Sequence, residues 1–164
     1  RKAGGSVSSW RHLSRVLHLV LESVQIAGLR IWVHGREFPQ SSDYWDGNWL
    51  RVTAYCSYPQ SSVRVHGSIL HLGEIHGLNR EVETLCQTLQ GQAELRCLEP
   101  NLGVKLQAQT GGHIRVKIAI TPDHMTESHS YTDGFDQTFL PPIIDGCKAI
   151  LDKFPLREAE ALLR

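Results

Sequence analysis

The stretch DYWDGNWLRV, residues 43–52, gathers two tryptophans, a tyrosine and two aspartates around one glycine. Aromatic rings beside carboxylates offer apolar area and charge together, as protein contact sites do. Asp-Gly-Asn is also turn chemistry, so the same residues suit a loop folded over its own core. We predict that Trp45 and Trp49 plug the core. The candidates for contact with a partner are Asp43, Tyr44, Asp46 and Asn48.

A second set of candidates consists of basic residues at alternate positions in strand-like segments. If these segments form one sheet, the cations share its solvent-facing side, where they could meet an acidic partner or phosphates. Long cationic side chains also decorate most exposed sheets and discourage edge aggregation. No interleaved aromatic platform for nucleic-acid bases accompanies them. The basic candidates for partner binding are Arg51, Arg64, Lys105, Arg115 and Lys117.

Catalytic motifs are missing from the sequence, which has no G-x-S-x-G, P-loop or H-E-x-x-H pattern. The nine histidines are scattered, and the five-residue step from His71 to His76 places them on different faces of a helix. Without a C-x-x-C pair a metal site is unsupported, and we expect four reduced thiols on apolar faces: Cys56, Cys86, Cys97 and Cys147. We therefore predict no catalytic residue, no metal ligand and no cofactor.

Length and composition predict one globular domain. A chain of 164 residues can bury a sizeable core, and its formal net charge of zero gives no general attraction to nucleic acid or to an anionic membrane. No apolar run approaches the ~20 residues of a membrane span. We expect a cytoplasmic protein. Residues 1–9 would be a flexible leader or a cloning remnant, and residues 10–164 a single α+β domain.

Apolar and polar residues alternate from residue 49 onward, which predicts half-buried strands. Paired glycines in TGGH, residues 110–113, predict a hairpin turn. The expected strands are 25–34, 50–56, 63–69, 93–97, 104–108, 114–120 and, as a polar edge, 128–136. The expected inward residues include Val52, Val65, Leu95, Leu106, Val116 and Ile118. The regular alternation predicts an antiparallel sheet with one wet face.

Three segments have helical spacing. The first main helix covers 72–89 and ends at Gly91 as its C′ residue. The second covers 140–154, with Thr138 as N-cap, and packs through Ile144, Cys147 and Leu151. Residues 10–24 could form an extra N-terminal helix. The predicted fold is therefore α+β: a single antiparallel sheet of six to seven strands, with two main helices on one face.

Three longer phrases carry a resemblance to a known family. They are HGREFPQSSDYWDGNWLRV (34–52), CLEPNLGVKL (97–106) and FDQTFLPPIIDGCKAILDKFP (135–155). Together they resemble the WapI-type immunity proteins, small stand-alone bacterial proteins, over about residues 29–155. The phrase YWDGNW, residues 44–49, is the most specific part.

The resemblance implies a non-enzymatic inhibitor that binds and blocks a toxin domain. Some relatives lie beside cell-wall-associated toxins whose C-terminal domains cleave transfer RNA. The expected partner is thus a cognate toxin or another protein, with no nucleic acid and no membrane, and with a homodimer left open. The alternative is a small enzyme or a nucleic-acid-binding protein that uses the basic face of the sheet.

Overall fold

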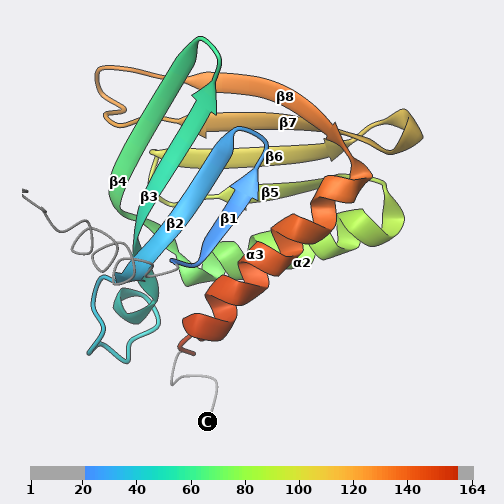
Figure 1. Cartoon of the computed structure of the whole chain (residues 1–164). Helices are drawn as coiled ribbons and strands as arrows, with labels where there is room; N and C mark the ends of the chain where they lie inside the picture. Colours follow the sequence, from blue (N-terminus) through green and yellow to red (C-terminus); the bar gives the residue numbers. More distant parts are fainter. Residues whose placement is uncertain (1–20, 159–164) are drawn as a thin grey trace, which may run out of the picture.

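The computed structural model describes residues 21–158, which form two antiparallel sheets and two helices (Figure 1). The first sheet has the strand order β1 (Ser23–Ile26), β2 (Leu29–Arg36), β3 (Trp49–Tyr58), β4 (Ser61–His71). The second has the order β5 (Gln92–Arg96), β6 (Leu102–Ala108), β7 (His113–Ile120), β8 (Ser130–Asp136). Helix α2 (Leu72–Thr88) joins the sheets, and α3 (Leu140–Lys153) follows β8. Short 3-10 turns occupy Asp46–Asn48, Thr110–Gly112 and Gln137–Phe139.

The α+β class is confirmed, but the single sheet of six to seven strands is wrong. Helix α2 begins directly after β4, so the chain leaves the first sheet there and starts a second four-stranded sheet at β5. Within each sheet, consecutive strands pair with one another. The alternating pattern is the same for one sheet or two, which is why it did not reveal the division.

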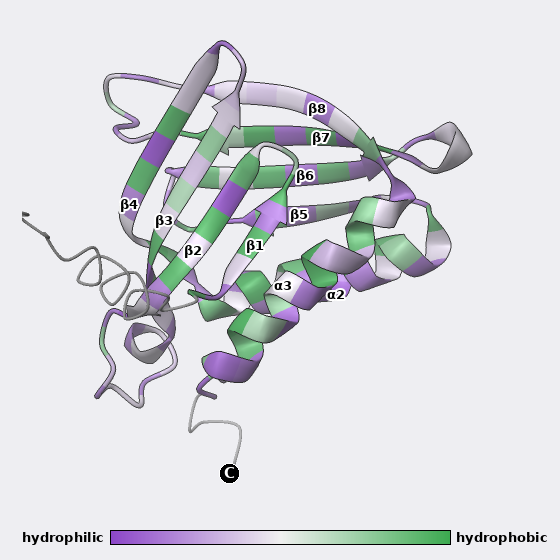
Figure 2. Ribbon diagram, in the orientation of Figure 1, coloured by the Kyte–Doolittle hydropathy of each residue, from purple (hydrophilic) through white to green (hydrophobic). Residues whose placement is uncertain are grey.

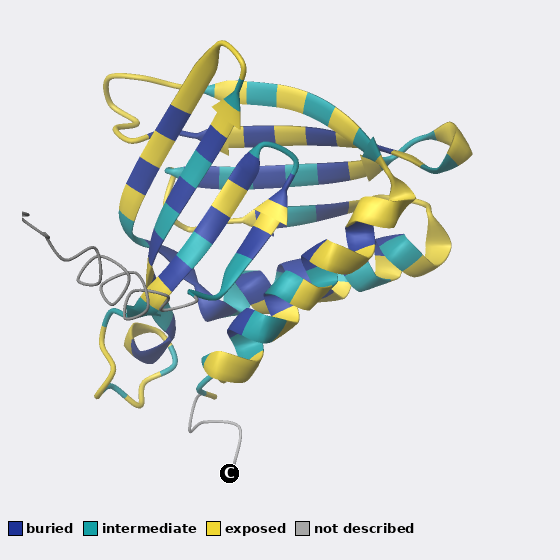
Figure 3. Cartoon of the chain, in the orientation of Figure 1, coloured by how far each residue is buried: buried dark blue, intermediate teal, exposed yellow. Residues whose placement is uncertain are grey.

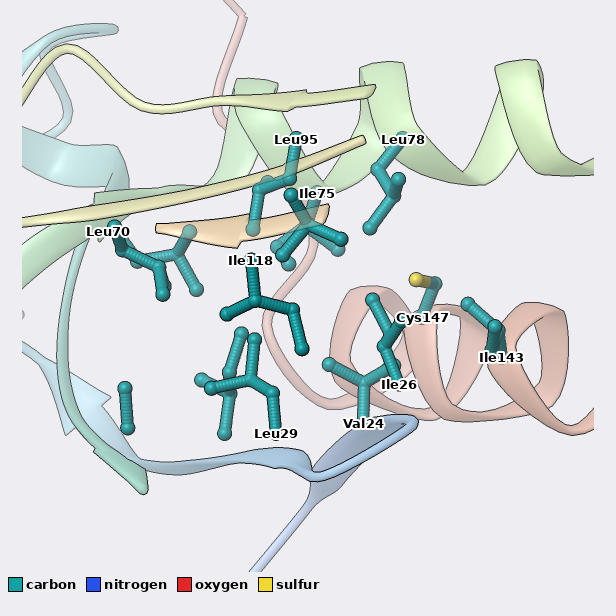
Figure 4. Packing of buried hydrophobic residues seen from close by; sticks show 14 of the residues in the cluster. Val24, Ile26, Leu29, Leu70, Ile75, Leu78, Leu95, Ile118, Ile143 and Cys147 are labelled. Atoms are coloured by element: carbon teal, nitrogen blue, oxygen red, sulfur yellow. The ribbon is translucent and has the colours of Figure 1, made fainter. Parts of the chain in front are cut away.

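The apolar faces of both sheets share one core. Hydropathy and burial alternate along the strands in step (Figures 2 and 3), and side chains of the two sheets meet in the interior, as Leu29 and Ile118 do (Figure 4). The predicted inward residues are all buried, which confirms their orientation: Val52, Val65, Leu95, Leu106, Val116 and Ile118. Each sheet therefore shields the apolar face of the other sheet from water.

Helices α2 and α3 pack against each other and lie along the edge strands β5 and β1, respectively (Figure 1). The two helices close one side of the core. The prediction had placed them on one face of a sheet. Gly146 permits the close approach of α3 to β1, because a Cβ there would lie 2.9 Å from the Ser23 carbonyl oxygen. On the other side, Tyr58 Oη donates to Asp133 Oδ2 at 2.9 Å and thereby joins the β3–β4 hairpin to β8.

Helix α3 faces the core with a slightly different stripe from the one predicted. Cys147 is fully buried, as expected, but Ile144 and Leu151 are only half-buried. The buried stripe consists of Leu140, Ile143, Cys147 and Ile150. The predicted cap was also wrong: Thr138 donates to the Asp136 carboxylate in the preceding 3-10 turn, and α3 begins at Leu140.

Further local predictions also needed correction. Residues 25–34 do not form one strand, because Ala27 (φ 50°) and Gly28 turn the chain between β1 and β2. Val24 lies in β1 and not in a helix, while residues 10–20 of the expected N-terminal helix fall outside the described part. Helix α2 ends at a left-handed Leu89 before it reaches Gly91. The hairpin turn at 110–113 and the edge position of β8 are confirmed.

All four cysteines lie within the described residues and are free thiols. Burial raises the pKa of Cys147 to about 12 and that of Cys56 to about 11, with a further contribution from Asp133 to Cys56. In the range 21–158, no helix is long and apolar enough to cross a membrane.

Candidate partner-binding site

The loop 37–48 between β2 and β3 is ordered by its own side chains and backbone. Asp43 Oδ1 accepts hydrogen bonds from the backbone amides of Trp45 (2.8 Å) and Asp46 (2.9 Å). The Gly47 amide donates to the Asp43 carbonyl oxygen at 2.8 Å. The Asp43 carboxylate thereby supports the 3-10 turn that leads into β3. Asp43 and Asp46 nevertheless remain exposed to solvent.

Asn48 joins this loop to Arg157, in the segment that follows α3. Its side chain is fully buried. The amide nitrogen donates to the carbonyl oxygens of Tyr44 (2.6 Å) and Arg157 (2.8 Å), and the amide oxygen accepts from the Arg157 backbone amide (2.9 Å). Arg36 Nη1 adds a fourth bond to the amide oxygen at 3.3 Å, which saturates the side chain, so Asn48 positions the loop.

Two guanidinium groups complete this anchor. Arg157 donates to the carbonyl oxygens of Ser41 and, at 2.7 Å, of Pro39. Arg36 donates to the carbonyl oxygens of Gly47 (2.5 Å) and Pro155. Burial and the nearby Arg157 charge lower the pKa of Arg36. The loop is therefore held by residues more than a hundred positions away in the sequence.

Three aromatic rings of the loop and of the start of β3 pack around His71. The ring of Tyr44 lies 5.3 Å from that of His71, Trp49 also 5.3 Å, and Trp45 5.7 Å. His71 caps α2: its Nδ1 accepts from the Gly73 amide at 3.1 Å, so Nε2 carries the proton and donates to the Tyr44 carbonyl oxygen at 3.2 Å. Tyr44 and Trp49 are half-buried. The prediction that Trp45 plugs the core was wrong, since its side chain is 58% exposed.

A groove lies between α2 and the edge strand β5, next to Trp45. Its lining includes Trp45, Glu74, Gly77, Glu94, Arg96 and Leu98, and its volume is about 280 Å³. We call it the α2–β5 groove. Leu98, which also lines it, is 64% exposed. Two large exposed apolar side chains thus line a hollow that residues 21–158 leave open.

Carboxylates from α2 fix the β5 side of the groove. Glu74 accepts from the Leu98 amide at 2.7 Å, and Glu81 accepts from the Glu94 amide at 2.8 Å. Arg96 pairs with Glu81 at 2.7 Å and with Glu94 at 3.2 Å. These two acids raise the pKa of Arg96. The groove therefore has a rigid, hydrogen-bonded wall with an acidic excess.

The five basic candidates do not share one face, because they lie on the outer sides of two different sheets. Arg51 on β3 pairs with Glu37 at 3.5 Å, and Arg64 on β4 stacks over Tyr55 with 5.4 Å to the ring centroid. The other three candidates, on β6 and β7, surround a small hollow of about 70 Å³ together with Gln107: Lys105, Arg115 and Lys117. Lys105 stands directly opposite Lys117 in the register.

The predicted site residues thus separate into three groups. Asp43, Tyr44, Asp46 and Asn48 lie together in the loop; Arg51 and Arg64 lie on the first sheet; Lys105, Arg115 and Lys117 lie on the second. Sequence reasoning missed Leu98 and Gly77 as groove residues and Arg157 as an anchor of the loop. Only the isolated Leu98 in the turn-rich segment 97–101 gave a hint. Within residues 21–158, no group of three or more His, Cys, Asp or Glu side chains is placed to hold a metal ion.

The structure defines an α+β protein with two antiparallel sheets and an ordered, partly exposed aromatic loop at one end. The family model described as the immunity protein WapI-like family matches residues 20–155, most of the chain. The chain therefore belongs to this family. Neither the comparison with curated proteins nor that with solved structures gave a match.

Proposed function

We propose that this protein acts in the cytoplasm as an inhibitor that binds a protein toxin and has no turnover of its own. Its membership of the immunity protein family, over residues 20–155, is the observation that carries the proposal. An inhibitor of this kind needs a rigid surface with a few desolvated anchors and steering charges. The loop 37–48 and the α2–β5 groove offer candidates for both: exposed apolar side chains that a partner would cover, and exposed carboxylates.

Trp45 and Leu98 are the proposed anchors. Large exposed apolar side chains that line a hollow gain free energy when a partner covers them, and tryptophan is enriched among interface residues that dominate binding. The exposed carboxylates of Asp43 and Asp46 lie in the same loop and supply steering charge. Tyr44 packs against Trp45 edge to face, with the ring centroids 5.2 Å apart. Asn48 acts as a positioning residue.

The basic group on the second sheet is a proposed second contact region. Glu94 lines the α2–β5 groove and stands opposite Lys105 in the β5–β6 register. The group of Lys105, Lys117 and Arg115 is therefore adjacent to the groove. One partner could cover both the groove and this basic group. In the described part of the chain these three cations form no ion pair, so they are available for an acidic patch. Arg51 and Arg64 lie on the other sheet, outside this surface.

Binding to the product of the neighbouring gene tests the proposal, because immunity genes stand beside their toxin genes. We expect a stable complex and loss of toxin activity. Trp45→Ala should weaken binding by roughly 30-fold, the effect of removing an interface anchor, with an unchanged melting temperature. Met125→Ala is the matched control, since Met125 is also an exposed apolar side chain but lies in the β7–β8 connection.

Two results would contradict the proposal. One is the absence of any complex with the toxin. The other is hydrolysis of RNA or of a small ester by the purified protein, abolished by a single His→Ala substitution. The second result would support the alternative of a small enzyme.

A further inference from the structure

Within residues 21–158, nothing in the structure requires a glycine at Gly77, in the second turn of α2. Its backbone φ is ordinary for a helix, and a Cβ added there would have nothing within 4 Å. Gly73, one turn earlier, differs, because a Cβ there would lie 2.9 Å from the Tyr44 hydroxyl. Glycine inside a helix costs conformational entropy. The chain thus accepts a less stable helix at a position where an alanine would fit.

The missing side chain of Gly77 keeps a continuous groove open. Gly77 lines the α2–β5 groove and also the adjoining hollow of about 480 Å³ between Arg80 and Gln92. The two hollows therefore meet over its bare backbone. Trp45 and Leu98 line the first hollow and not the second.

The charges around this groove are predominantly negative. The two hollows are lined by four glutamates and two arginines: Glu74, Glu81, Glu83, Glu94, Arg80 and Arg96. Lys148 of α3 offsets Glu83 through an ion pair of 2.7 Å. The exposed Asp43 and Asp46 add two negative charges at the Trp45 end. Complementarity therefore favours a partner segment with basic residues.

We propose that the groove over Gly77 receives a bulky apolar side chain of the toxin, flanked by basic residues, and that Gly77 determines this specificity. The inference rests on the proposed function and names the chemistry of the partner segment. The apolar side chain packs between Trp45 and Leu98, and its basic neighbours pair with the acidic rim.

Titration with short peptides tests the groove without the toxin. The probes are an acetylated, amidated Lys-Trp-Lys peptide and its Glu-Trp-Glu counterpart, followed by amide and indole NMR shifts. We expect saturable shifts at Gly77, Leu98 and the Trp45 indole with the basic peptide only. Equal binding of both peptides, or shifts confined to another surface, would overturn the inference.

Filling the groove provides the second measurement. Gly77→Leu should weaken the binding of both the basic peptide and the toxin at least about tenfold, because the leucine fills the groove and the anchor side chain can no longer enter it. The melting temperature of the variant should be no lower than that of the parent protein. Gly77→Ala is the matched control with a smaller effect. If Gly77→Leu does not fold, Leu98→Ser at an exposed position replaces it and should weaken peptide binding in the same way.

Three outcomes separate this inference from the proposed function. If Gly77→Leu binds the toxin as tightly as the parent protein does, the groove inference is refuted and the inhibitor proposal is unaffected. No complex with the toxin in any variant would remove the inhibitor proposal, while the peptide titration would still decide on the groove. Concentration-dependent dimerisation that buries the Trp45 indole would assign the groove to a second copy of the chain and overturn the inference.

Discussion

Replacing Asn48 with Ala tests whether the loop 37–48 depends on Arg157, in the segment that follows α3. Three of the hydrogen bonds of Asn48 measure 2.6–2.9 Å, to Tyr44 and to both backbone groups of Arg157. Each such bond contributes about 0.5–1.5 kcal/mol net, so their combined loss lies in the range of about 1.5–4.5 kcal/mol. Because water can reach the half-buried Arg157 in the variant, we expect a loss of about 3 kcal/mol. For a domain of this size, this lowers the melting temperature by roughly 10 °C.

Urea unfolding followed by circular dichroism measures the free energy of unfolding, and hydrogen exchange of the Arg157 amide measures the local anchor. We expect lower stability and faster exchange in Asn48→Ala. Ser42→Ala is the control from the same loop, because Ser42 is exposed and its side chain forms no hydrogen bond within residues 21–158. A loss below about 0.5 kcal/mol, together with unchanged protection of the Arg157 amide, would refute the reasoning.

The remaining predictions concern the core, the α2 helix and pH. Ile143→Ala should lower the free energy of unfolding in urea by about 2–5 kcal/mol. Ile144→Ala should lower it clearly less, because Ile144 is half-buried, and the reverse order would contradict the described face of α3. Gly77→Ala should raise the free energy of unfolding by about 0.5–1 kcal/mol, and a lower melting temperature would contradict the open space at that position. Burial raises the pKa of Cys147 from its ordinary value of 9.0 to about 12. The unfolded chain therefore loses this proton first, and stability falls as pH rises from 9 towards 12. Cys147→Ala should show a shallower fall above pH 9, measured by unfolding at several pH values.

The candidate site was predictable only in part. The crowded aromatic and acidic residues of 43–49 correctly indicated an ordered loop, because turn chemistry and buriable rings are local properties. Which ring stays outside was not predictable, since Trp45 and Trp49 have the same side chain in similar sequence surroundings. Both rings pack against His71, but Trp49 is the first residue of strand β3 and is half-buried, whereas Trp45 precedes the 3-10 turn in the loop and remains exposed.

The split of the basic residues shows the same limit. Alternation correctly predicted that Arg64 and Lys117 point away from the core, because successive side chains of a strand alternate in direction. It did not predict that they lie on different sheets, since a strand has the same pattern whichever sheet it joins. Pairing with its neighbours assigns each strand to a sheet.

The sequence by itself determined the inward side chains of the strands, the turn at Gly111 and Gly112 and most of both helices. These features follow from the period of the apolar residues and from turn chemistry within a few residues. Only the tertiary structure decided that two sheets share one core, that helices close its side, and that Arg157 holds the loop. The free energy of these arrangements comes from contacts between segments far apart in the chain, for which no local pattern exists.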